Sequence, residues 1–352
     1  MYATASCRFP YLDEWKHYCD NNRICAFIDS VLSGYAQLAF NDNTFSGLLM
    51  LIATWIGSPT LCINALWGTI VATAFSYMIK LPAGSIRAGL YGANAALSCL
   101  AVPVLLFPSQ EISAAMLIAS AAISIFTVLL VKLLGKPFSK WNLPSLVVPY
   151  CIVLSISLMI LTATGISSPV PATLESLLFT CKFSDWSFSE IITAFLNCAA
   201  EILWLVKPLS GILYLIALSF ASRFDMVNTI IAIIVSILVS TALGLPKDAV
   251  MTGLYGYNAI LLTQVLTRSF LLNSRSYLLT FCMAAFSPVM CCLYQLILPR
   301  LGIGSFLALP YLTLVFLVLT NRKHLKGFTY VPAKHWGVPE TIRKEFKKSP
   351  PQ

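Results

Sequence analysis

The amino-acid sequence predicts an all-α integral membrane protein built from two inverted repeats, each with five transmembrane helices and one re-entrant pore helix. Three observations support this prediction: the composition, the length of the apolar runs and an internal duplication. Of the 352 residues, 58% are hydrophobic and 11% are charged, whereas soluble domains carry about 25% charged residues. The apolar runs have the length that a bilayer core requires, which is roughly 20 residues. A soluble chain of this composition would aggregate, so we expect the bilayer to be its solvent.

The duplication becomes visible when the chain is shifted by 164 residues. The shift superimposes residues 89–95 (GLYGANA) on residues 253–259 (GLYGYNA), and it also aligns a Ser-Gly pair and a Leu-Pro pair. Between 37–100 and 201–264, 20 of the 64 residue pairs are identical. Two unrelated apolar segments would share some leucines, but not Gly, Pro and Asn at one fixed offset. The two halves are therefore repeats of one another.

Each half contains five apolar segments of spanning length. Because five is odd, we expect the second half to enter the bilayer upside down, which is the inverted-repeat plan of many transporters. The segments are 44–61, 62–79, 86–107, 112–134 and 145–165 in the first half, and 208–222, 226–243, 250–267, 277–298 and 304–320 in the second. The resulting regions are a cytoplasmic N-terminal segment (1–23), the first repeat (24–166), an extracellular connector (167–186), the second repeat (187–321) and a basic cytoplasmic tail (322–352).

The basic residues predict the orientation of the chain. With both termini in the cytoplasm, all but four of the 23 Lys and Arg lie on the cytoplasmic side, as the positive-inside rule requires. The four exceptions are Lys182, Lys207, Lys247 and Arg300. Eight basic residues follow Thr320 and are interpreted as a topology anchor, so the net charge predicts no nucleic-acid partner. We expect a multi-pass protein of the cell membrane, with the lipid bilayer as its main partner.

Two further stretches, 24–40 and 187–204, precede the first span of each half. Each is amphipathic and short, and it either lies on the membrane surface or enters the bilayer as a re-entrant pore helix. Gln37 and Glu201 favour the pore helix, because they are equivalent in the two repeats and each precedes a large aromatic residue by three positions. An ionisable group at membrane depth costs at least ~2.5 kcal/mol and usually marks a transport pathway.

The side chains of these two stretches predict the kind of solute. The oxygens of Gln37 and Glu201 accept hydrogen bonds, which suits a solute that carries N–H donors. Phe40 and Trp204, if they face each other, form a flat slot that selects a planar solute and removes water from its faces. Urea and short amides are planar, small, uncharged and rich in donors, so they are the predicted solutes.

The repeated motif Gly-Leu-Tyr-Gly-x-Asn lies in the third span of each half. Two glycines within four residues weaken a helix and permit close backbone approach. We therefore expect a broken helix with a close contact between the repeats, and helix packing alone is the alternative. The two asparagines are expected to bond to backbone groups rather than to solute. The motif residues are Gly89, Gly92 and Asn94 in the first repeat, and Gly253, Gly256 and Asn258 in the second.

The sequence offers no residues for a metal, a cofactor or catalysis. His17, His324 and His335 lie outside the apolar spans, and no Cys-x-x-Cys motif occurs, which argues against the usual haem and metal sites. No nucleophile with a base at recognisable spacing is present, so an amide hydrolase is not expected. A scaffold or sensor that docks through the basic tail is the other alternative to transport.

At these residues the chain resembles the urea transporter family, over about residues 25–320. The matching features are Gln37–Phe40, Phe45–Leu49, Leu143–Tyr150, Pro208–Leu213, Pro310–Tyr311 and both copies of Gly-Leu-Tyr-Gly-x-Asn. The resemblance implies a homotrimer with one continuous, channel-like pore in each protomer. It also implies solute sites around Gln37, Phe40, Glu201 and Trp204, and a middle constriction at Ala93, Leu97, Tyr257 and Leu261.

The chain departs from the family pattern at two positions. The family usually places a threonine two residues before the proline of each fifth span, where this chain has Val147 and Ala308. Without these hydroxyls the solute loses hydrogen bonds, which predicts slower flux or a preference for a less polar amide. The resulting function prediction is passive, channel-like transport of urea, with related small amides as further candidate solutes. The alternative is proton-coupled transport of urea or an amide, with Glu201 as the proton carrier.

Overall fold

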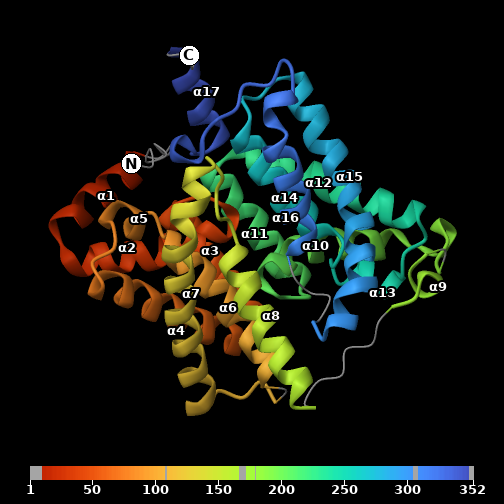
Figure 1. The fold of residues 1–352 in the computed structure, drawn as a ribbon, viewed down its shortest axis with the longest axis horizontal. Coiled ribbons are helices and arrows are strands. Elements are labelled where there is room, and N and C mark those ends of the chain that lie inside the picture. Colours follow the sequence, from red (N-terminus) through yellow and green to blue (C-terminus); the bar gives the residue numbers. More distant parts are fainter. Residues whose placement is uncertain (1–9, 108, 166–171, 179, 304–307, 349–352) are drawn as a thin grey trace.

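The computed structural model describes residues 10–107, 109–165, 172–178, 180–303 and 308–348, and nearly all of them are helical (Figure 1). In this described part the only β-pairing is an isolated bridge between Phe270 and Tyr330. The fold class is therefore all-α, as predicted. The helices form one continuous assembly in which the apolar core runs through both halves of the chain.

Apart from α1 (Pro10–Asn21), the two halves contain the same kinds of helices in the same order. The first half comprises α1 (Pro10–Asn21), α2 (Arg23–Ala36) with the 3₁₀ turn η1 (Gln37–Ala39), α3 (Thr44–Gly57), α4 (Pro59–Met78), α5 (Ala83–Arg87), α6 (Leu90–Leu106), α7 (Ala114–Lys140) and α8 (Val148–Ala163). The second half comprises α10 (Phe188–Ala200) with the turn η3 (Glu201–Leu203), α11 (Pro208–Ala221), α12 (Arg223–Ala242), α13 (Lys247–Met251), α14 (Gly256–Ser269), α15 (Ser274–Ile297) with the turn η4 (Leu298–Leu301) and α16 (Leu309–Thr320).

Short elements complete the chain between and after the halves. Between them lie α9 (Leu174–Leu177) and the turn η2 (Phe183–Asp185), in the region expected to be the connector. After α16 come the turns η5 (Arg322–His324) and η6 (Ala333–His335) and the helix α17 (Pro339–Lys348), in the region expected to be the tail.

Several of the predicted spans are shorter than expected. Among the described helices, α4, α7, α12 and α15 are long and apolar enough to cross a membrane unaided, and α10–η3 with α11 meets the same criterion only as a pair bent by 70°. The helices α3, α6, α8 and α16 are apolar but have 14, 17, 16 and 12 residues. Ten uniform spans are therefore too simple a description. Broken and short helices are tolerated at membrane depth where they are buried in protein or line a cavity.

Two serines explain where neighbouring helices meet. Ser58 accepts a hydrogen bond from the Leu61 amide at the start of α4, and Ser222 accepts one from the Asp225 amide at the start of α12. A serine at this position satisfies an amide that has no partner within the helix. The 164-residue shift relates these two serines. The α3–α4 junction therefore lies at Ser58, three residues before the boundary that apolar content alone predicted.

The motif Gly-Leu-Tyr-Gly-x-Asn breaks a helix in both halves. Gly89 (φ 74°) separates α5 from α6, and Gly253 (φ 90°) lies between α13 and α14. A side chain on Gly89 would overlap the backbone of Ser33 and Gly34, and one on Gly253 would overlap that of Asn197. These neighbours belong to the same half as each glycine, so the expected contact between the repeats is wrong. Each broken helix instead packs against α2 or α10 of its own half.

The contact between the halves is formed chiefly by α3 and α11. The Ser210 hydroxyl donates to the Ala53 carbonyl at 2.8 Å, and the rings of Phe45 and Phe220 meet edge to face at 4.8 Å. The two helices are equivalent under the 164-residue shift. The halves therefore meet through the same face of the repeated unit.

Large apolar side chains cover the outside of the helices. Ile118 and Leu133 on α7 are 70% and 68% exposed, and Leu278 on α15 is 68% exposed. Soluble monomers rarely present extensive apolar surfaces to water. In a membrane protein the same surface faces lipid, which matches the composition of the chain.

Candidate functional site

One cavity of about 280 Å³ lies between the halves, and all ten predicted pore residues line it. Five come from the first half and five from the second. They are Gln37, Phe40, Ala93, Leu97, Val147, Glu201, Trp204, Tyr257, Leu261 and Ala308. The cavity therefore brings together residues that are separated by up to about 270 positions in the chain.

Gln37 and Glu201 each begin the 3₁₀ turn that ends a short amphipathic helix. The Gln37 amide nitrogen donates to the Ala88 carbonyl at 2.9 Å. Because a carbonyl can pair only with the NH₂ end of the amide, this bond orients the amide and leaves its oxygen as a free acceptor. The Glu201 side chain is partly buried and has no hydrogen bond or ion pair with the described residues. Both side chains can therefore accept hydrogen bonds from a solute.

Phe40 and Trp204 end these turns in the left-handed conformation, with φ of 53° and 59°. Bulky residues rarely adopt it, and such conformations cost about 1–3 kcal/mol. In each turn the amide of the aromatic residue donates to the carbonyl of Gln37 or Glu201 at 3.0 Å. The two rings line the cavity, but they are not among the ring pairs in contact in the described structure. A slot that admits a planar solute requires the two rings to stand apart, so the expected slot between them stays a prediction.

The residues expected at the middle constriction and beside it are largely apolar. Val147 and Ala308 lie directly before the first turns of α8 and α16 and are 7% and 4% exposed. Leu97 and Leu261 are equivalent positions on α6 and α14, while Ala93 is paired in sequence with Tyr257. At this pair of equivalent positions the second half therefore has a tyrosine hydroxyl, whereas the first half has only the methyl group of Ala93.

The two motif asparagines hold the helix starts that carry Val147 and Ala308. Asn94 donates to the Leu146 carbonyl at 3.1 Å and accepts from the Tyr150 amide at 3.2 Å. Asn258 accepts from the Tyr311 amide at 3.3 Å. Both therefore bond to backbone, as expected from the sequence. Helix starts leave unpaired amides that such side chains satisfy.

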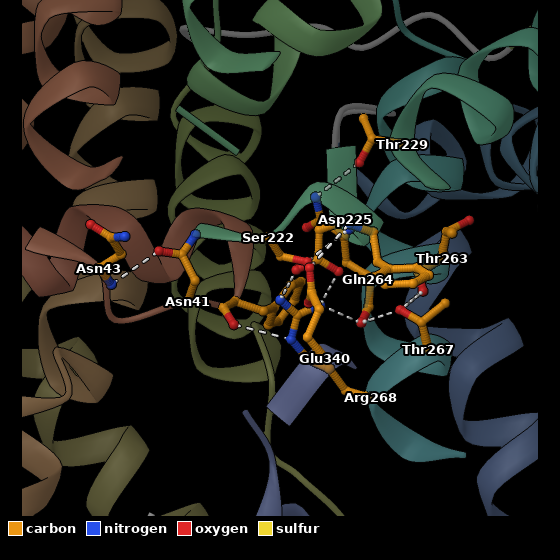
Figure 2. Close-up of polar contacts among 12 residues, drawn as sticks. Asn41, Asn43, Ser222, Asp225, Thr229, Thr263, Gln264, Thr267, Arg268 and Glu340 are labelled. Atoms are coloured by element: carbon orange, nitrogen blue, oxygen red, sulfur yellow. Dashed lines mark hydrogen bonds and ion pairs between the residues drawn. The ribbon is translucent and has the colours of Figure 1, made fainter. Parts of the chain in front are cut away.

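Arg268 is a lining residue that the sequence did not indicate. It was expected at the end of a span on the cytoplasmic side, but it lies in the last turn of α14 and is only 1% exposed. Its guanidinium forms an ion pair with Asp225, with one N···O distance of 2.6 Å (Figure 2). The available signal was that Asp225 and Arg268 are isolated opposite charges beside apolar runs of the same repeat.

The C-terminal tail also contributes to the cavity. Ala333, Trp336, Gly337 and Val338 line it, and Val331 and Ile342 of the same segment are buried. The tail is held by main-chain bonds from Val331 to Ser269 at 2.8 Å and from Leu271 to Thr329 at 2.9 Å. The interpretation of the tail as a topology anchor alone is therefore incomplete. Its apolar residues were the signal that part of it folds back onto the protein.

The apolar helices and the shared cavity define a multi-pass helical membrane protein with a cavity between its halves. The urea transporter family profile matches residues 28–323, so the chain belongs to the urea transporter family. It is 27% identical over 320 residues to urea transporter 1 of Ovis aries, and the alignment covers 86% of this chain and 79% of the relative. The corresponding Mus musculus protein is 27% identical over 326 residues, with the same coverage of both chains. This is a family of transport proteins rather than enzymes.

Proposed function

We propose that this protein carries urea passively down its gradient, through a channel-like pore between two inverted repeats. The observation that supports this most strongly is the single cavity that all ten pore positions share. Unpaired acceptors at Gln37 and Glu201 suit a donor-rich solute, and the apolar walls between them exclude ions because they cannot replace a hydration shell. Two carboxylates, Glu201 and Asp42, are among the described residues that line the cavity, and Asp42 forms an ion pair with Lys16 at 3.1 Å. Glu201 is therefore the only one of the two without a charged partner, and a chain of proton carriers usually needs more than one.

The arrangement of the loops supports the inverted topology with both termini in the cytoplasm. The tail contacts the loop after α14 through Ser269 and Leu271, and Arg322 donates to the Trp141 carbonyl beyond α7 at 3.0 Å. Lys247, which is expected on the extracellular side, donates to the Asp185 carbonyl of the connector, which is expected on the same side, at 2.7 Å. Segments expected on one side of the membrane thus contact one another, which supports the proposed domain boundaries as well.

Stopped-flow light scattering of proteoliposomes tests the proposed transport. We expect urea flux well above that of protein-free liposomes, proportional to the urea gradient and unchanged by a pH gradient or a membrane potential. Flux no faster than in protein-free liposomes would contradict urea transport. Urea accumulation against its gradient, driven by a proton gradient, would instead indicate coupling through Glu201.

We expect the apolar side chains of Val147 and Ala308 to limit the rate of urea transport and to alter which amides the protein prefers. Replacing Val147 and Ala308 together by threonine adds two hydroxyls to the cavity, which should raise urea permeability by about tenfold if one hydrogen bond is gained in the rate-limiting position. The measurement is the permeability for urea, thiourea, formamide and acetamide in the same liposomes.

Val148→Thr is the matched control for this substitution, because Val148 begins the same helix but lines an outer groove between α8 and α16. It should leave all four permeabilities unchanged. A wild-type protein that clearly prefers urea, with no gain in the double variant, would contradict the altered selectivity.

Shortening the tail should widen access to the cavity. A chain that ends at Pro332 keeps the main-chain bonds of Val331 but lacks Trp336 and Val338, which line the cavity. We expect a severalfold higher urea permeability at equal protein density. The control is Lys323→Gln with Lys326→Gln, which removes charge from two exposed tail residues outside the cavity lining. Equal or lower flux in the shortened chain would show that the tail does not restrict access.

A homotrimer with one pore in each protomer is the proposed assembly. Native mass spectrometry of the detergent-purified protein should give three times the mass of the chain, which is 38.6 kDa. A monomer that retains full urea flux after reconstitution would contradict the need for the trimer.

A further inference from the structure

The Arg268 side chain donates four hydrogen bonds, and one of them reaches the other half of the chain. The guanidinium binds Asp225 through two hydrogen bonds, of 3.1 and 2.6 Å, and donates to the Gln264 carbonyl of its own helix at 2.8 Å. Its remaining nitrogen, Nε, donates to the Phe40 carbonyl at 3.1 Å. Asp225 and Arg268 are both buried, at 0% and 1% exposure.

The repeat itself shows that the fold does not require this pair. Under the 164-residue shift, Leu61 and Val104 occupy the positions of Asp225 and Arg268 in the first half. That half forms α4 and α6 without the two charges. Buried ion pairs contribute little net stability compared with apolar side chains of similar size. The pair in the second half therefore has another role.

That role is indicated by the one bond that leaves the second half. Phe40 adopts the left-handed conformation, in which its amide bonds to Gln37 and its carbonyl to Arg268. Such a conformation persists only where the surroundings fix the backbone on both sides. The backbone angles of Phe40 also determine where its ring lies in the cavity.

We propose that Arg268 is a positioning residue, which holds Phe40 at the pore so that its ring selects the solute. Asp225 compensates the charge of the buried guanidinium and orients it, because its two oxygens match the fork of Arg268 and leave Nε free for Phe40. The proposal rests on the proposed transport function, which it deepens by adding a residue that determines specificity without touching the solute.

The tail is linked to this arrangement. The Glu340 carboxylate accepts from the Ser222 hydroxyl at 2.7 Å and from the Phe224 amide at 3.3 Å, and Ser222 accepts from the Asp225 amide at 3.0 Å (Figure 2). A continuous series of hydrogen bonds therefore leads from the tail through Asp225 and Arg268 to Phe40. Any test on Arg268 must leave Glu340 intact.

The decisive variant copies the first half into the second: Asp225→Leu with Arg268→Val in the full chain. Hydrogen–deuterium exchange should then be faster in the peptide 37–43, while the equivalent peptide 201–207 exchanges as in the wild type. In proteoliposomes the ratio of urea to thiourea permeability should fall by about tenfold, the effect of losing one hydrogen bond to a charged group. Arg268→Lys should behave similarly, because it keeps the charge but not the fork.

The control is Arg275→Met, which removes an exposed arginine at the start of α15 and should change neither measurement. Unchanged exchange in 37–43 would overturn the proposal, and so would equally faster exchange in both peptides, which indicates general loosening. The exchange measurement does not depend on transport. If the wild-type chain moves no urea, the proposed function fails while the effect on Phe40 is still decided.

Discussion

Replacing Glu201 by leucine is expected to lower urea permeability by at least about a hundredfold, whereas glutamine should retain most of it. The Glu201 carboxylate lines the cavity and has no partner among the described residues. Leucine offers no acceptor, so N–H groups of the passing solute stay unpaired at about 1–3 kcal/mol each. Glutamine keeps one acceptor oxygen of nearly the same shape. Stopped-flow measurements at equal protein density compare the two variants.

Glu175→Leu is the matched control, because it removes an exposed carboxylate from α9 and should leave the flux unchanged. Equal loss in Glu201→Gln and Glu201→Leu would contradict a passive acceptor. It would point to a carboxylate that must carry a proton, since the amide cannot ionise.

Gly211→Ala is expected to prevent the second half from packing, which is the largest effect on stability that we foresee. A methyl group on Gly211 would overlap the Leu196 carbonyl oxygen, where α11 crosses α10. The obstacle is backbone, so no side chain can move aside. The cost should reach about 3 kcal/mol or more, at the upper end for overfilled sites. Gly47→Ala meets the equivalent Leu32 carbonyl in the first half and should behave alike.

Gly84→Ala provides the control, because a methyl group there has nothing within 4 Å. It should melt like the wild type in detergent, while the two crossing variants should melt many degrees lower or fail to purify as monodisperse protein. A Gly211→Ala protein with wild-type thermal stability would show that α10 and α11 do not cross this closely.

The class of the fold, the repeat and ten of the residues that line the cavity could be predicted from the sequence, whereas the lining by Arg268 and by the tail could not. The lengths of the apolar runs indicate which segments lie in the bilayer. The fixed offset of 164 residues pairs Gln37 with Glu201 and Phe40 with Trp204. Pairing equivalent residues predicts a shared site because two copies of one unit pack through the same face. The repeat accounts for four of the ten predicted pore positions, and the resemblance to the urea transporter family accounts for the other six.

The long-range partners of the helices follow from tertiary packing and could not be predicted from the sequence. The glycines of the repeated motif pack within their own half, because a residue's neighbour in space is set by helix crossing rather than by sequence symmetry. Arg268 is buried instead of exposed because Asp225, 43 residues away, compensates its charge. Trp336 lines the cavity because the tail bonds to Ser269. No local sequence pattern marks the partners in these contacts, because the partners are distant in the chain and come together only when the helices pack.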